Sequence, residues 1–130
     1  MQLRDTIKVL DSDAHARDFD SDGRLMRYPL ADTTRTLGFD PATRIVAAHD
    51  ATASTTYAYD ELDRLRSWQP PGLPQSYDYD ANGNRTRHGV GADSHGYGVN
   101  PASNRLDSVS GPTAKVYSYN QSGNITGDGR

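Results

Sequence analysis

The sequence repeats one short pattern of residues every twenty positions, six times in succession. An aromatic residue stands at five of the six anchor positions, and Asp or Asn follows each anchor. The anchors with their followers are Phe19-Asp20, Phe39-Asp40, Tyr59-Asp60, Tyr79-Asp80, Val99-Asn100 and Tyr119-Asn120. A fixed period of this length is typical of repeat architectures, in which each unit packs on its neighbours. The period therefore predicts a stack of equivalent units, which lowers the expectation of a single catalytic centre.

Each copy of the repeat has the pattern of a strand, a turn and a second strand. The run from Tyr77 to Asp80 alternates aromatic and acidic residues, which is the period of a strand with one buried face. The next residues, to Gly83, predict a tight turn, because Asp bonds the backbone ahead of it and Gly tolerates positive φ. The residues that define the repeat structurally are Phe19, Asp20, Phe39, Asp40, Tyr57, Tyr59, Asp60, Tyr77, Tyr79, Asp80, Gly83, Tyr97, Tyr117, Tyr119 and Gly123.

The predicted fold is all-β and consists of stacked β-hairpins. Residues 1–14 are predicted to be a nonrepeating lead-in that adds an edge strand, and residues 15–130 hold about six repeats. The repeats are 17–36, 37–56, 57–76, 77–96, 97–116 and a truncated copy, 117–130. Equivalent side chains are expected to form columns, Tyr on Tyr. A column of like-charged Asp residues would repel, so each Asp is expected to bond turn backbone or a neighbouring Arg.

The slot at the end of each turn is not always glycine. It holds Gly23, Thr43, Asp63, Gly83, Ser103 and Gly123 in the six copies. Because glycine alone adopts positive φ at no steric cost, we expect the other three turns to differ in type. On that reasoning Gly83→Val destabilises the protein more than Thr43→Val, since only the glycine position requires positive φ.

The composition favours an ordered chain with a small core. Leu, Ile, Val and Phe account for 20 of 130 residues, below the roughly 20% at which disorder becomes a serious alternative. The net charge of −3 is modest, however, and eight tyrosines are present. The arginines are spread over all the repeats and not gathered in one basic patch, which argues against nucleic-acid binding. No apolar run approaches the length of a membrane helix, and Met1 to Leu10 do not resemble a signal peptide.

Two segments imitate a calcium-binding loop. Asp18–Gly23 and Asp78–Gly83 match the opening of an EF-hand, but the twelfth loop position, which should be Glu, is Pro29 in one and Gly89 in the other. Both matches fall in the repeat frame, where the same residues have a role in turns. We therefore predict no metal site at either segment.

No catalytic or cofactor site is predicted elsewhere. The chain has no cysteine, and its histidines share neither a repeat slot nor a metal-ligand spacing: His15, His49, His88 and His95. Most of the acidic residues recur with the period, which suits turns better than a unique site. The chain is therefore not expected to be an enzyme.

The aromatic residues leave a binding role open. A row of rings that included Tyr57, Trp68 and Tyr77 would suit sugar stacking or partner docking. The same rings are also what the sheet needs for its core, and the small aliphatic content favours that structural role. Both roles remain predictions at this point.

The repeat resembles the YD repeat of the RHS family. The motif from Tyr57 to Leu65 reads Tyr-x-Tyr-Asp-x-x-x-Arg-Leu, and the motif from Tyr77 to Arg85 reads Tyr-x-Tyr-Asp-x-x-Gly-Asn-Arg. Residues 103–106 and 117–129 are similar to variants of the same motif. The resemblance spans about residues 17–130, although the first two copies have Phe for the second Tyr and lack the first.

The resemblance implies long strands wound into a spiral sheet that can close as a hollow shell. In bacteria such shells surround a C-terminal toxin and are secreted or displayed at the cell surface, whereas teneurin-type proteins in animals carry a similar shell and act in adhesion. It therefore implies a structural shell segment that helps encapsulate or carry a secreted toxin. The alternative it leaves is a carbohydrate- or protein-binding adhesion module at the cell surface.

The resemblance also implies the partners. They are neighbouring RHS repeats or a toxin cargo, with a glycan or a cell-surface protein in the alternative; no nucleic acid and no cofactor is expected. Neither the core motif that precedes the family's toxins nor a toxin domain is found within the 130 residues. We therefore expect a piece of a larger shell wall, whether fragment, truncated gene or remnant. Its unpaired sheet edges would favour self-association.

Overall fold

The computed structural model describes residues 8–9 and 16–129, and all regular secondary structure in them is β-strand. The predicted all-β fold of successive antiparallel hairpins is confirmed. Within the described residues no helix is long and apolar enough to cross a membrane. The chain divides into two compact units, residues 1–58 and 59–130, and each is described by itself.

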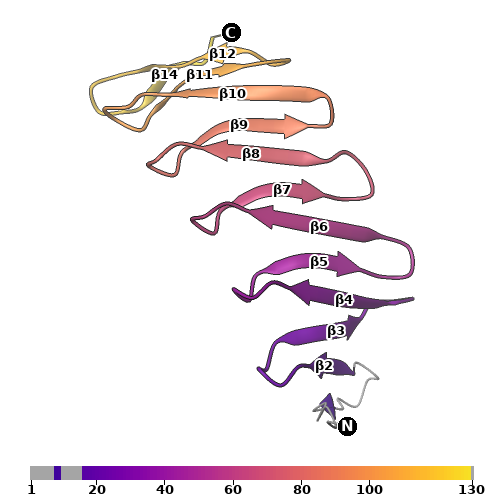
Figure 1. Ribbon diagram of the computed structural model, residues 1–130. Coiled ribbons are helices and arrows are strands. Elements are labelled where there is room, and N and C mark those ends of the chain that lie inside the picture. Colours follow the sequence, from indigo (N-terminus) through magenta and orange to yellow (C-terminus); the bar gives the residue numbers. More distant parts are fainter. Residues whose placement is uncertain (1–7, 10–15, 130) are drawn as a thin grey trace. The chain divides into compact units, whose positions relative to one another are not determined.

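In the first unit each strand pairs antiparallel with the strand that follows it in sequence (Figure 1). A chain that returns through short turns needs no crossover connection, so sequence order and spatial order coincide. The strands are β1 (Lys8–Val9), β2 (Arg17–Phe19), β3 (Leu25–Pro29), β4 (Thr34–Phe39), β5 (Ile45–His49) and β6 (Ser54–Tyr59). Most of the predicted lead-in lies outside the described residues; its Lys8 pairs with Asp18 of β2.

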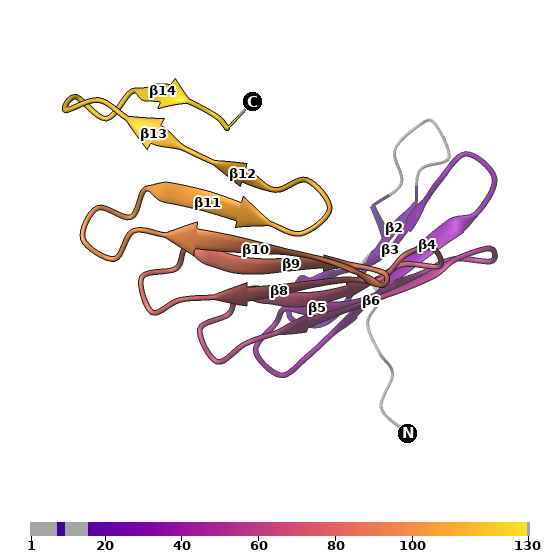
Figure 2. The ribbon, with the colours of Figure 1, turned by 90° about the horizontal axis from the view of Figure 1, so that it is seen from above.

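The second unit is also an antiparallel meander, and it ends in a separate pair of strands. Its main strands are β7 (Leu65–Gln69), β8 (Gln75–Tyr79), β9 (Arg85–Val90), β10 (Asp93–Val99), β11 (Leu106–Ser110) and β12 (Lys115–Val116). The final pair, β13 (Ser118–Tyr119) and β14 (Ile125–Gly127), follows β12 (Figure 2). Directly opposed residues project to the same face of a sheet, so His88, opposite both Tyr77 and His95, shares a face with them.

The turns at the Asp end of the hairpins share one geometry. In the first copy the amide of Asp20 donates to the Arg24 carbonyl and that of Gly23 donates to the Asp20 carbonyl, both at 3.0 Å. Equivalent bonds close the turns that begin at Asp40, Asp60, Asp80 and Asn120. In the fifth copy Asn100 donates to Arg105, so that loop is one residue longer.

The expectation that only the glycine turns need positive φ is wrong. Thr43 and Asp63 have φ of 66° and 60°, in the same left-handed region as Gly83 at 88°. In the longer loop Asn104 takes this role instead of Ser103, with φ of 54°. The repeated hydrogen bonds impose the backbone conformation whichever side chain fills the slot. Thr43, a β-branched residue, therefore carries strain that the glycine turns avoid.

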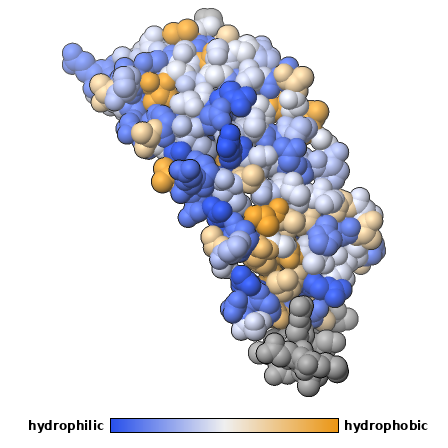
Figure 3. Space-filling model, viewed as in Figure 1, coloured by the Kyte–Doolittle hydropathy of each residue, from blue (hydrophilic) through white to orange (hydrophobic). Residues whose placement is uncertain are grey.

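Neither unit has a conventional hydrophobic core. Among the described residues Ala48, 7% exposed, is the only buried hydrophobic side chain, and no side chain is fully buried. Several large apolar side chains are exposed, Leu62, Leu73 and Val116 among them. The view in Figure 3 shows apolar surface in small patches separated by polar side chains. Each unit is therefore stabilised mainly by contacts between neighbouring strands of its sheet.

Thr43→Gly is expected to stabilise the protein. The change relieves a left-handed conformation that costs a β-branched residue about 1–2 kcal/mol. The greater conformational freedom of glycine in the unfolded chain offsets about 0.5–1 kcal/mol of that gain. The free energy of unfolding from urea titration measures the effect. Ala42→Gly, at the neighbouring position where φ is not positive, should destabilise. A loss of stability in both variants would contradict the assigned strain.

Candidate functional site

The Asp at the end of each outgoing strand is bound within its own turn. In the first copy Oδ1 of Asp20 accepts the amides of Asp22 at 3.0 Å and Arg24 at 2.9 Å, and Oδ2 accepts Nε of Arg24 at 2.7 Å. The Arg24 amide is the largest cause that holds the pKa of Asp20 below its ordinary value, followed among the lowering contacts by the Arg24 side chain. Asp40 and Asp60 bind Arg44 and Arg64 in the same way. The expectation that each Asp bonds turn backbone or a neighbouring Arg is confirmed, and in these copies the Asp makes both kinds of bond.

The same geometry accounts for the segments that imitate calcium loops. Asp80 accepts the amides of Asn82 and Asn84 and the Asn84 side-chain amide, so both its oxygens have partners in the chain. The preceding acid of the motif, Asp78, pairs with Arg87 at 2.6 Å. Within the described part of the chain no group of three or more His, Asp or Glu side chains is arranged to hold a metal ion.

At three places an arginine also contacts the aromatic ring of the next repeat. The guanidinium carbon lies 5.4 Å from the ring centroid for Arg24 on Phe39, 4.7 Å for Arg64 on Tyr79 and 5.5 Å for Arg105 on Tyr119. These distances are those of cation–π contacts. At these three junctions a guanidinium contacts the ring in place of the ring-on-ring column expected from the sequence.

Where the ring is a tyrosine, its hydroxyl adds a bond to the preceding repeat. Tyr79 donates to the Leu65 carbonyl at 2.8 Å, and Tyr119 donates to the Leu106 carbonyl at 2.7 Å. Each acceptor directly follows the arginine that covers the ring. We call the contact between the arginine of one repeat and the ring of the next the guanidinium–ring junction. At Arg24 and Arg64 the arginine is also bound to the Asp of its own turn.

One junction lacks both the arginine and the ring. Asn84 stands in the arginine slot of the fourth copy, and Val99 stands in the ring slot of the fifth. Asn84 bonds instead to Oδ1 of Asn104 at 3.0 Å. Among the interfaces between successive repeats of the chain, the replaced arginine and the replaced ring thus occur at the same one. This coincidence is the signal in the sequence that identifies the pair.

The structure divides the repeat-defining residues between several roles. Asp20, Asp40, Asp60 and Asp80 cap turns, and Gly83 and Gly123 supply positive φ. Phe39, Tyr79 and Tyr119 are junction rings, Phe19 ends β2 opposite Leu25, and Tyr57 and Tyr59 lie on β6. The remaining tyrosines, Tyr77, Tyr97 and Tyr117, belong to the cluster described below.

A corner in the first unit depends on an ion pair that the repeat pattern does not indicate. The Asp50 side chain is only 2% exposed, and its Oδ2 accepts Nη2 of Arg35 at 2.5 Å. Oδ1 accepts the amide and hydroxyl of Thr52 and the amide of Ala53. The Arg35 bond, then those from Thr52, hold the pKa of Asp50 far below its ordinary value. Asp50 is thus an additional turn cap at the opposite end of the hairpins.

A cluster of aromatic and basic side chains lies on one face of the second unit. The rings of Tyr77 and His88 stack at 5.0 Å with an angle of 11°, and Arg85 lies 5.2 Å from the Tyr77 ring centroid. Gln75 Oε1 accepts both the Tyr77 hydroxyl at 2.8 Å and Nε2–H of His88 at 2.9 Å. His95 lies 6.3 Å from His88. Burial, then the positive charges of Arg85 and His95, lower the pKa of His88.

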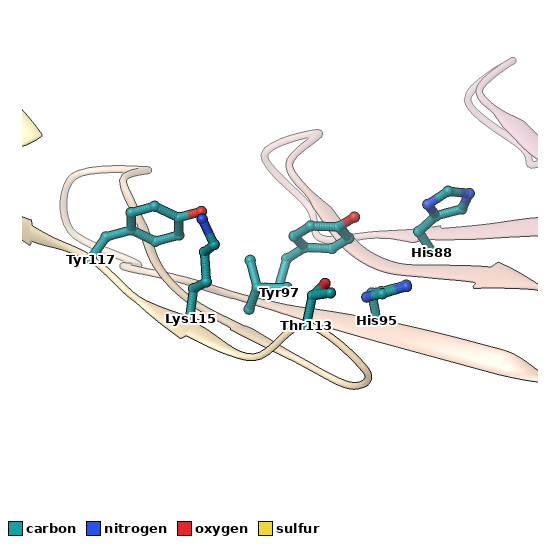
Figure 4. A pocket seen from close by; sticks show the side chains of 7 residues that line it. His88, His95, Tyr97, Thr113, Lys115 and Tyr117 are labelled. Carbon is teal, nitrogen blue, oxygen red and sulfur yellow. The ribbon is translucent and has the colours of Figure 1, made fainter. Parts of the chain in front are cut away.

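Next to this cluster the face is hollowed into a shallow basin of about 300 Å³. Its lining side chains come from β9, β10, β11, β12 and the adjoining connections (Figure 4). They are His88, His95, Tyr97, Thr113, Lys115 and Tyr117, with Val109 among them. The basin has no equivalent in the repeat motif, because His88, Thr113 and Lys115 occur in no common slot, so the sequence pattern alone did not identify it.

Comparison with known proteins identifies the fold. No protein-family model matches the chain, and no curated protein matches it. Among solved structures it is similar to the crystal structure of TcdB2-TccC3-Cdc42, with a TM-score of 0.65 and 16% identity over 86% of this chain. The chain spans 7% of the length of that chain, which belongs to a Tc toxin with an RHS-repeat shell. At the level of the fold, the resemblance to an RHS-repeat shell that the repeats predict is confirmed.

Arg64→Lys is expected to reduce the free energy of unfolding by about 1–3 kcal/mol. Arg64 bonds Asp60, donates from Nη1 to the Asp80 carbonyl at 2.9 Å and covers the Tyr79 ring, and an ammonium cannot make all three contacts. Chemical denaturation measures the change. Arg87→Lys is the matched control, since Arg87 makes one exposed ion pair with Asp78, and should cost no more than about 0.5 kcal/mol. Equal losses would contradict the junction.

The melting temperature is expected to fall between pH 7.5 and 5, and His88→Gln should make that fall smaller. The pKa of His88 is lower in the folded than in the unfolded protein. Its contribution is therefore complete above the unfolded value of about 6.5 and is lost as the pH falls from there through the lower pKa of the folded protein. The groups facing it are Tyr77 and Gln75 on β8, Arg85 on β9 and His95 on β10.

The matched control for this pH dependence is His49→Gln on β5, where the side chain is exposed. It should leave the slope of melting temperature against pH unchanged. Calorimetry of the three proteins in buffers of equal ionic strength provides the measurement. If the slope of melting temperature against pH is as steep in His88→Gln as in the unmodified protein, the pH dependence does not come from His88.

Proposed function

We propose that the chain is a structural segment of an RHS-type shell, one part of a wall that encloses or carries a secreted toxin. The likeness to a segment of the TcdB2-TccC3 shell, which covers 7% of the matched chain, supports the proposal. The partners proposed for it are further shell repeats and the cargo, and the proposed location is outside the producing cell.

The observation that carries the proposal is where the stabilising contacts lie. The guanidinium–ring junctions link one repeat to the next, at Arg24 with Phe39, at Arg64 with Tyr79 and at Arg105 with Tyr119. Among the described residues only Ala48 is a buried hydrophobic side chain, so a single hairpin has almost no interior of its own. Such a unit gains stability by adding neighbours, which is the property required of a wall element.

The polar residues of the repeat support a structural rather than a catalytic role. The carboxylates of Asp20, Asp40, Asp60 and Asp80 accept turn amides, and the first three also bind their own arginines. Groups engaged in this way are not available as acids, bases or nucleophiles. We therefore propose that the chain has no catalytic activity of its own.

The proposal predicts association through the strand edges. An isolated wall segment presents unpaired backbone groups that a second chain can pair with. Light scattering after size exclusion, over a hundredfold range of protein concentration, should show species larger than the 14.2 kDa monomer. Ile125→Lys should shift them toward monomer, because Ile125 lies on the terminal strand β14 and is 59% exposed.

Leu62→Lys is the control for this test. Leu62 is 66% exposed, comparable to Ile125, but lies in a turn away from any strand edge. If pairing of strand edges drives association, Leu62→Lys should leave the distribution of oligomer sizes unchanged. If exposed apolar surface drives association, both variants should be monomeric. A monomer at every concentration in the unmodified protein would count against the wall proposal.

A further inference from the structure

The side chains that line the basin on the second unit include a basic group but no acidic one. Its polar lining consists of hydroxyls, imidazoles and the Lys115 ammonium, and it contains no carboxylate. The nearest acidic contact is between Lys115 and Asp128, at 3.5 Å, with both side chains more than a third exposed. Such a pair contributes little and exchanges readily with solvent or a ligand. Although the chain has a net charge of −3, the one formal charge in the lining of this hollow is the positive charge of Lys115.

The tyrosines of the basin differ from the junction tyrosines in what their hydroxyls do. Tyr79 and Tyr119 donate to backbone carbonyls, and Tyr77 donates to Gln75. Within the described residues the hydroxyls of Tyr97 and Tyr117 make no hydrogen bond. The two basin rings are only half-buried. Their hydroxyls therefore remain free to bind a ligand, and their exposed ring faces offer apolar surface beside them.

The cross-strand register holds these groups in fixed relation. Tyr97 lies opposite Val109, and Val109 lies opposite Lys115, so all three project to one face. His95, two positions before Tyr97, lies on the same face and opposite His88. Figure 4 shows the labelled side chains on the same side of the strands. The lining thus combines a rigid sheet, two aromatic walls and one cation.

We propose that this basin binds the carboxylate-bearing ring of an anionic saccharide. The ammonium of Lys115 would take the carboxylate, the hydroxyls of Tyr97, Tyr117 and Thr113 would bond sugar hydroxyls, and the tyrosine rings would pack against the C–H groups of the sugar. A hollow of about 300 Å³ is at the small end of ligand sites and suits one or two sugar rings.

An acidic peptide fits the same charge less well. Peptides are bound along sheets mainly by backbone hydrogen bonds at an edge strand, whereas His88, His95, Tyr97 and Val109 lie on β9, β10 and β11, which are paired on both sides. Of the strands that line the hollow, only β12, with Lys115, is at the edge of the sheet. A polyhydroxylated ring also uses the many single hydroxyls of the lining, which a carboxylate side chain would leave unpaired.

The test is a titration of the full chain with glucuronate, and with glucose as the neutral counterpart, followed by ¹H–¹⁵N correlation spectra at pH 7. Glucuronate should shift the amide signals of residues around Tyr97, Lys115 and Tyr117, while glucose should bind at least about tenfold more weakly. Equal shifts with both sugars, or none with glucuronate up to about 50 mM, which corresponds to negligible binding free energy, would overturn the proposal.

Variants assign the binding to these side chains. Lys115→Met should weaken glucuronate binding by about tenfold, and Tyr117→Phe by a few-fold, because it removes only a hydroxyl. Arg87→Met is the control, since residue 87 precedes His88 and projects to the opposite face of β9. An equal loss in that variant would indicate nonspecific attraction of anions and would overturn the proposal.

A short glutamate peptide completes the experiment. Tighter binding of that peptide than of glucuronate at the same residues would replace the saccharide with a polypeptide and overturn the assignment. The circular dichroism spectrum of each variant shows whether it has folded, and Tyr117→Phe removes a single atom if Lys115→Met does not fold. Self-association is a separate readout, so failure of sugar binding leaves the shell proposal standing.

Discussion

The contact on which this fold depends is that of an arginine with the ring of the following repeat. Arg64 shows all of its parts: Nε binds the turn carboxylate of Asp60, Nη1 binds the Asp80 carbonyl, and the guanidinium plane lies against Tyr79. A cation–π contact contributes about 0.5–1 kcal/mol at an exposed site and more when it is desolvated. The arginine also fixes the turn, so one side chain couples the conformation of a hairpin to its packing on the next.

This coupling explains how the chain forms a sheet with so little apolar burial. A domain of ordinary composition orders its strands by packing aliphatic side chains between layers, and here Ala48 is the only buried hydrophobic side chain of the described residues. The alternative is a series of equivalent local contacts, each modest and each between neighbours, so that stability accumulates along the chain. Planar groups suit this arrangement, because a guanidinium and a phenol ring stack without interdigitating as aliphatic side chains must.

The sequence was sufficient to predict the structure of a single repeat but not the contacts between neighbouring repeats. The period predicts the hairpins, the Asp caps and the glycine turns, since each depends on residues within five positions of one another. The prediction that Thr43 does not adopt positive φ was wrong, because a residue's own conformational preference is weaker than the hydrogen bonds of a repeated turn. The sequence also predicted ring on ring, where Arg24 lies on Phe39. The joint loss of the arginine at Asn84 and the ring at Val99 was visible in the sequence, but it becomes meaningful only once the two slots are known to touch.

The two tyrosines of the motif are subject to different constraints. The second ring, as in Tyr79 and Tyr119, is held by an arginine and, through its hydroxyl, by a backbone carbonyl. A substitution there removes a contact between repeats. The first ring has no such shared contact: Tyr77 donates to Gln75, whereas the hydroxyls of Tyr97 and Tyr117 have no partner among the described residues. Its slot tolerates replacement, by Arg17 and Leu37 in the early copies. A repeat that holds only one of its two ring positions by a shared contact can keep its fold while its exposed face changes. His88 and Lys115, which belong to no repeat slot, lie on that face.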